Sequence, residues 1–207
     1  MSKTESAVRK LFEGIDSYTS ILKRHPTAVF VTSYTNEADF HAQYEAWARE
    51  NESQIRASLE AEREYMAESF AQATFCGAIL QVAAKAIECF SKNTSVPEDW
   101  SAIVKVGTKA VPFCAGRLIR DVPLGLVIHA ARNQHTHFDD DELREPNISV
   151  FERLAVNHGI KSGQPFRDPA FDIQNTRLVS YASNCTALMG WRTYEAYEQD
   201  MHALLEI

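Results

Sequence analysis

The chain has 207 residues with a net charge of −7, and 45% of its residues are apolar and 24% charged. This length is enough for a sizeable core in one domain, and the composition is that of an ordinary globular protein. The negative charge argues against sequence-independent coating of DNA, although it is compatible with a local positive cleft. No apolar run reaches the roughly 18 residues of a membrane span, and the first six residues lack the apolar segment of a secretory signal. We therefore expect a cytoplasmic protein that does not enter a membrane.

The N-terminal half is predicted to be mostly helical. A first helix over 4–24 should end at His25-Pro26, because the residue before proline disfavours the helical conformation. Segment 28–32 is β-branched and predicts either a strand or a buried turn. Segment 36–76 contains no glycine or proline and is rich in strong helix formers. The run 53–91 becomes apolar on almost all sides, which predicts a central, buried helix.

The C-terminal half contains more proline and glycine residues, which divide it into shorter segments. Segment 99–110 predicts a short helix. The acid and proline of Asp121-Val122-Pro123 predict an N-cap and first turn, from which a helix runs through the apolar residues 124–128. Asn147 is expected to cap a further helix that Gly159 ends. Beyond a surface loop at 162–169, we predict one long closing helix over 172–206, with a kink at Gly190.

Together these elements predict an all-α helical bundle in a single domain, 1–207. Within it, 1–50 is expected to be an N-terminal helical addition, about 53–160 the core, and 172–206 a C-terminal helix. The four cysteines form no Cys-x-x-Cys pair and have apolar neighbours, so we expect buried thiols rather than disulfides or a zinc site; they are Cys76, Cys89, Cys114 and Cys185.

The most informative motif follows the apolar run 124–128. Its six residues are Arg132-Asn133-Gln134-His135-Thr136-His137. Arginine carries a permanent charge on a planar fork that suits phosphate, and histidine exchanges a proton near neutral pH. On a regular helix Arg132 and His137 would point about 140° apart. They can share a substrate only if the helix ends or distorts between them, or if two copies of the chain bring their motifs together across a two-fold axis.

Such a set can cut RNA without a metal or another cofactor. A histidine can take the proton of the ribose 2′-hydroxyl or protonate the leaving 5′-oxygen, and arginine can stabilise the extra charge on phosphorus. Asn133 can orient the histidine or donate to a phosphate oxygen. Because the internal nucleophile is absent from DNA, this mechanism would be specific for RNA.

The run from Arg132 to Asp140 resembles the signature of the HEPN superfamily (higher eukaryotes and prokaryotes nucleotide-binding). That signature is arginine, a polar residue that is often asparagine, three to five variable residues, and histidine. The resemblance implies a bundle of about four or five helices and a dimeric, metal-independent endoribonuclease. Many relatives serve as toxins or in phage defence, some with an antitoxin protein as partner. By this resemblance Arg132 and His137 form the catalytic pair, and Asn133 supports them.

The match covers about ten residues, and the chain departs from the family in two ways. Asp139 stands where some relatives carry a tyrosine that accepts AMP from a nucleotidyltransferase antitoxin, so the resemblance does not extend to that control. The chain is also longer than a minimal HEPN domain. A non-catalytic HEPN-like module that binds a nucleotide, RNA or protein is the alternative function.

Other interpretations of the same residues stay open. Arg132 can simply pair with the acids at 139–142. The histidines 129, 135 and 137 with Asp139 and Asp140 have the ligand types of a divalent metal site, although we expect none. Basic residues before the motif can line an RNA path or form a solvated face; the set is Lys105, Lys109, Arg117 and Arg120. We take His135, His129, Arg120 and Arg117 as the weaker substrate-binding candidates. The aromatic series Trp191, Tyr194 and Tyr197 is expected in the core or a dimer interface rather than as a base-stacking platform.

Overall fold

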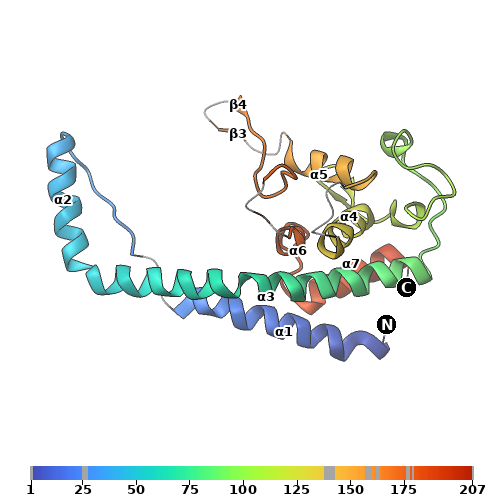
Figure 1. The fold of residues 1–207 in the computed structure, drawn as a ribbon, viewed down its shortest axis with the longest axis horizontal. Coiled ribbons are helices and arrows are strands. Elements are labelled where there is room, and N and C mark those ends of the chain that lie inside the picture. The colour runs from blue at the N-terminus through green and yellow to red at the C-terminus, as the bar shows by residue number, and fades with distance from the viewer. Residues whose placement is uncertain are drawn as a thin grey trace. The chain divides into compact units, whose positions relative to one another are not determined.

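A computed structural model describes residues 2–24, 28–137, 143–156, 160–161, 164–175, 178 and 180–206. In this part of the chain helices dominate, which confirms the all-α class (Figure 1). The helices are α1 (Ser2–Arg24), α2 (Glu37–Glu50), α3 (Glu52–Phe90), α4 (Leu124–Thr136), α5 (Asn147–Ala155), α6 (Ala182–Leu188) and α7 (Tyr194–Leu205), with the short 3-10 turns η1 (Glu98–Trp100) and η2 (Val111–Phe113). Two antiparallel hairpins of two-residue strands complete the list: β1 (Leu118–Ile119) with β2 (Val122–Pro123), and β3 (Ile160–Lys161) with β4 (Gln164–Pro165).

The chain divides into two compact units, which we describe separately. Unit 1 comprises Met1–Phe12 and Ala73–Ile207, and unit 2 comprises Glu13–Gln72. Helices α1 and α3 each contribute to both units.

Helix α4 forms the centre of unit 1. Its apolar residues Leu126, Val127 and Ile128 are completely buried, and the helix packs against α5 and α6 (Figure 1). The C-terminal part of α3 adds buried side chains such as Ile79 and Leu80 to the same core. The apolar run before the motif was therefore correctly predicted to be helical, and its burial holds the motif on a fixed element.

The start of α4 differs from the prediction. Asp121 does not cap a helix; with Arg120 it forms the two-residue loop of the β1–β2 hairpin, at φ values of 62° and 47°. Two successive positive φ angles are typical of the tight turns that join antiparallel strands. The Leu124 amide donates to the Arg117 carbonyl, so the helix begins only where the hairpin closes.

The predicted closing helix over 172–206 is wrong. The chain forms α6 and α7 instead, and between them Gly190 adopts a φ of 76°, which is readily accessible to glycine. Thr193 then caps α7, because its hydroxyl accepts a bond from the Ala196 amide. The aromatic series in this region was expected in the core or in a dimer interface, and it lies in the core. Trp191, Tyr194 and Tyr197 are all buried.

Three smaller predictions also need correction. Segment 99–110 forms only the turn η1 at its start and no helix, and the expected loop at 162–169 contains β4. The four cysteines are free, but Cys89 is exposed rather than buried. The end of α5 is at Ala155, and Gly159 lies outside the described residues.

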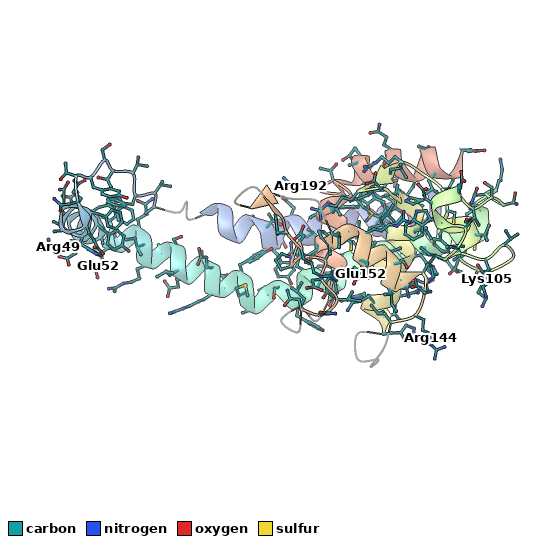
Figure 2. All side chains as sticks on the ribbon, turned by 90° about the horizontal axis from the view of Figure 1, so that it is seen from above. Arg49, Glu52, Lys105, Arg144, Glu152 and Arg192 are labelled. Atoms are coloured by element: carbon teal, nitrogen blue, oxygen red, sulfur yellow. The ribbon has the colours of Figure 1, made fainter. Side chains whose placement is uncertain are left out.

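Unit 2 contains α2 and the adjoining ends of α1 and α3. Segment 28–32 is neither a strand nor a buried turn; it is extended, with Val29 and Val31 largely exposed, while the Phe30 ring contacts the rings of Tyr44 and Trp47 on α2. Asn36 caps α2 by accepting a bond from the Asp39 amide. Figure 2 labels Arg49 and Glu52 at the corner where α2 gives way to α3. None of the residues of α2 is buried.

One described helix, α3, is long and apolar enough to cross a membrane by length and composition alone. This is weak evidence, because the core helix of a soluble protein meets the same criterion. Ile79, Leu80 and Ile87 of α3 have no exposed surface, but Leu59, Met66 and Phe70 in its first half are exposed, so the prediction of a buried helix over 53–91 is correct only for the C-terminal part. The structure is therefore compatible with a soluble protein.

Candidate functional site

The motif lies at the end of α4, which runs to Thr136; His137 follows it as the C-cap, with a φ of −121° and a ψ of 40°. The His137 amide donates to the Asn133 carbonyl at 3.0 Å, and the Thr136 hydroxyl donates to the Arg132 carbonyl at 2.8 Å. The helix therefore ends between Arg132 and His137, which is one of the two arrangements that would let them share a substrate, and the angle of about 140° for an unbroken helix does not apply to this pair. The His137 side chain is exposed.

Arg132 is held from α3. Its Nη2 donates to Glu88 Oε1 at 3.0 Å, and Lys85 Nζ donates to the other oxygen of the same carboxylate at 3.1 Å. Burial alone would raise the pKa of Glu88, but the hydrogen bond from Lys85 and the charge of Arg132 outweigh it and lower the pKa. Two cations around one carboxylate leave a local excess of positive charge. The expected pairing of Arg132 with the acids at 139–142 falls on residues outside the described part of the chain.

Asn133 connects α4 with α5. Its side-chain amide donates to His129 Nε2 at 3.1 Å and to Asn147 Oδ1 at 3.3 Å. Asn147 was expected to cap α5, but Pro146 holds the N-cap position and Asn147 is the first residue of the helix, with a buried side chain. This network fixes the position of Asn133 between two helices.

His129 lies inside unit 1 rather than on an open surface. Its ring centroid is 4.6 Å from that of Phe113, and its Nδ1 is buried without a hydrogen-bond partner among the described residues. Burial, reinforced by the nearby charge of Arg132, lowers the pKa of His129 to about 4. The imidazole is therefore neutral at neutral pH and cannot attract a phosphate by charge.

This shifted pKa predicts a loss of stability in mild acid. The unfolded chain takes up a proton at His129 near pH 6.5, whereas the folded chain does so only near its pKa of about 4. The free energy of unfolding should therefore fall as pH decreases between these values, by ~3 kcal/mol in total from this residue. Urea unfolding at pH 7 and pH 4.5 measures the difference. His129→Gln, which keeps an acceptor for Asn133, should show a smaller difference, and an equal one would contradict the assignment.

His135 is also engaged inside unit 1. Its Nδ1 and the Ser180 hydroxyl lie 2.9 Å apart, and its ring lies against the backbone of α3 at Gly77, where a Cβ atom would come within 2.1 Å of the ring. Burial lowers the pKa of His135 as well. The three histidines thus have three different environments, and the described residues contain no group of three side chains that could hold a metal ion. Asp139 and Asp140, which the metal interpretation needs, lie outside the described residues.

The basic residues before the motif have separate roles. Arg117 donates to both carboxylate oxygens of Asp200, at 2.7 and 2.9 Å, and Arg120 donates to Asp168 at 2.8 Å. These two arginines therefore connect distant parts of unit 1. Lys105 and Lys109 are exposed on the segment between η1 and η2, where Figure 2 labels Lys105.

Sequence reasoning missed the partners that position the motif. Glu88, Asn147 and Ser180 are far from it along the chain, and nothing in their local patterns indicates a contact with it. Gly77 did carry a signal, because a glycine inside an apolar helical run often marks a close approach of another element.

No protein-family model, no curated protein and no solved structure matches this chain. The argument for function therefore depends on the residues and geometry of α4 and its neighbours.

Proposed function

We propose that this protein is a metal-independent endoribonuclease of HEPN type that acts as a two-fold dimer. The observation that carries the proposal is the difference among the three histidines of α4. His129 and His135 are partly buried, whereas His137 is exposed at the end of the helix. The residue that the signature assigns to proton transfer is thus the one that a substrate can reach.

The roles follow from the chemistry. His137 takes the proton of the ribose 2′-hydroxyl or protonates the leaving 5′-oxygen, and the 2′-oxygen forms a bond to phosphorus as the bond to the 5′-oxygen breaks. Arg132 stabilises the additional negative charge on the phosphoryl oxygens. Asn133, fixed between α4 and α5, is a positioning residue. The products are a 2′,3′-cyclic phosphate and a 5′-hydroxyl.

In the proposed dimer each active site is composite and pairs the arginine of one copy with the histidine of the other across the two-fold axis. Pairing also doubles the positive charge that Arg132 and Lys85 leave around Glu88, which helps an acidic chain to hold a phosphodiester. In the cell, such an enzyme would act in the cytoplasm as a toxin or phage-defence effector, with an antitoxin protein as its natural restraint.

The test is cleavage of total RNA by the purified protein in excess EDTA. We expect cleavage that persists in EDTA and leaves cyclic phosphate ends, and we expect Arg132→Ala and His137→Ala to abolish it. Arg192→Ala and His202→Ala are matched controls, because they make the same changes at exposed positions outside the motif. Activity that EDTA removes would instead support metal chemistry.

A non-catalytic binding module is the second candidate, and one observation favours it. The carboxylate of Glu88 accepts a hydrogen bond from Nη2 of Arg132 and therefore competes with a phosphate for this guanidinium. Under this alternative RNA remains intact while the protein still binds it, and Glu88→Gln tightens binding because it removes the competing charge. RNA that is neither cut nor bound would exclude both candidates.

A further inference from the structure

Two cations of unit 1 share a single carboxylate where α4 meets the C-terminal part of α3 (Figure 1). Lys85 Nζ donates to one oxygen of Glu88 at 3.1 Å, and Arg132 Nη2 donates to the other oxygen at 3.0 Å. Because both cations are hydrogen-bonded to one carboxylate, their nitrogen atoms lie at most about 8 Å apart. We call Lys85, Glu88 and Arg132 the shared-carboxylate cluster.

The shared-carboxylate cluster has more cations than anions, unlike other ion pairs of unit 1. Three other arginines each have at least one carboxylate to themselves: Arg117 with Asp200, Arg120 with Asp168, and Arg167 with both Glu152 and Asp172. Residues 73–92 of α3 and the segment after it, and residues 124–137, contain no acidic residue except Glu88. The cluster therefore carries a net charge of +1, which along these two segments has no further acid to balance it.

The two cations differ in how freely they can move. The side chain of Arg132 is 20% exposed, whereas that of Lys85 is 68% exposed. An exposed ion pair between residues three apart on a helix contributes little to stability, so its role in holding Glu88 costs little to give up. The lysine ammonium is a compact charge on a flexible stem, with three donors that can follow an oxygen ligand. Lys85 can therefore turn from Glu88 to a bound anion.

We propose that Lys85 binds the phosphate of RNA that lies next to the one that is cleaved. This inference rests on the proposed function, in which Arg132 contacts the phosphate that is cleaved. The separation of the two cations suits neighbouring phosphates of an extended strand, and their excess charge attracts the backbone. Lys85 has no part in proton transfer. The substrate class is therefore single-stranded RNA that extends beyond the cleaved linkage and passes over the exposed side of α3 at Glu88.

The test measures how RNA binding depends on salt. The His137→Ala variant is the background, because the RNA must remain intact, and the probe is a fluorescein-labelled, unstructured RNA of about twelve nucleotides. Each phosphate contact with a single strand adds about 0.7 to the slope of log affinity against log salt. Lys85→Gln should therefore lower the slope by about 0.7 and weaken binding about fivefold at 0.1 M salt. Lys85→Arg, which keeps the charge, should retain the slope of the background.

Further variants separate a direct contact with phosphate from an effect through Glu88. If Lys85 acted only by holding Glu88 away from Arg132, its replacement would have no effect once residue 88 is neutral. In the Glu88→Gln background we expect Lys85→Gln to lower the slope by the same amount. Lys10→Gln, at an exposed lysine on α1, is the matched control and should leave affinity and slope unchanged. In the cleavage assay with His137 intact, Lys85→Gln should raise KM about fivefold and leave kcat unchanged.

The outcomes separate failure of this inference from failure of the proposed function. RNA that is neither cut nor bound would overturn both. RNA that is cut, with an unchanged slope in Lys85→Gln, would overturn only the role of Lys85. An equal decrease in Lys10→Gln would mean that the lysines act as diffuse charge, and loss of the effect in the Glu88→Gln background would make Lys85 a purely structural residue. Bound but uncut RNA with the lower slope would support Lys85 as a phosphate-binding residue and contradict the ribonuclease. Circular dichroism checks that each variant keeps the helical content of the wild type.

Discussion

Mixing the Arg132→Ala and His137→Ala variants is expected to restore RNA cleavage that neither variant shows alone. Each change should lower cleavage at least ~100-fold, because one removes the stabilisation of the phosphoryl charge and the other removes proton transfer. The mixture differs because the proposed site takes its arginine from one chain and its histidine from the other. In a mixed dimer, one site combines both substitutions and the other has neither.

The expected recovery can be calculated from random exchange of subunits. About half of the dimers are mixed at equal concentrations, and each of these has one intact site of two, so activity should return to about a quarter of the wild-type value. Native mass spectrometry of differently tagged chains shows whether subunits have exchanged. A mixture of Arg132→Ala with the double variant Arg132→Ala, His137→Ala is the control, because no pairing of these chains creates an intact site.

The result separates two arrangements of the active site. If subunits exchange and activity does not return, both residues act from the same chain, which is compatible with the end of α4 at Thr136, between them. Recovery in the control mixture would show that Arg132 is dispensable. The experiment therefore tests the geometry of the site once the assay in EDTA has established that the protein cuts RNA.

The sequence predicted those parts of the fold that depend on local pattern. The long glycine-free stretch, the apolar run before the motif and the helical class all follow from periodicity and propensity, which act within a few turns. The errors lie where contacts between residues far apart in the sequence determine the local structure. The Asp121-Val122-Pro123 segment has the residues of a helix start, but it forms part of the hairpin in which β1 pairs with β2. The region 172–206 has helical periodicity, but the left-handed backbone at Gly190 divides it.

The same distinction applies to the candidate site. The sequence placed Arg132 and Asn133 on a helix and indicated that Arg132 and His137 can share a substrate only across a dimer or if the helix ends or distorts between them; the helix ends at Thr136. It could not distinguish the histidines, because His129, His135 and His137 differ only in what packs against them. Glu88 is 44 residues from Arg132, and its role depends on the packing of α3 beside α4. The burial of a side chain and its contacts with residues far along the chain cannot be predicted from the local pattern of one sequence.

Replacing Gly77 with alanine is expected to lower the free energy of unfolding by about 2 kcal/mol, although alanine favours helices more than glycine does. The new Cβ atom would come within 2.1 Å of the His135 ring, so the ring must leave its place and lose its hydrogen bond with Ser180. Urea unfolding of the purified variant measures this cost, and the wild type is the reference.

The physical cause can be isolated with a double-mutant cycle. His135→Ala alone should cost about 1–2 kcal/mol through lost packing and one lost hydrogen bond. In that background the methyl group that Gly77→Ala adds meets no ring, so this substitution should cost nothing or stabilise the helix, a coupling of about 2–3 kcal/mol.

Gly125→Ala is the matched control: its Cβ atom would lie 2.3 Å from the backbone carbonyl oxygen of Phe113, which no side-chain change relieves. It should therefore be equally costly with or without His135. Two results would contradict this explanation: rescue of Gly125→Ala by His135→Ala, or failure of His135→Ala to rescue Gly77→Ala. In either case the contact between α3 and α4 would not be what fixes the His135 ring, and the division of roles between His135 and His137 would lose its structural basis.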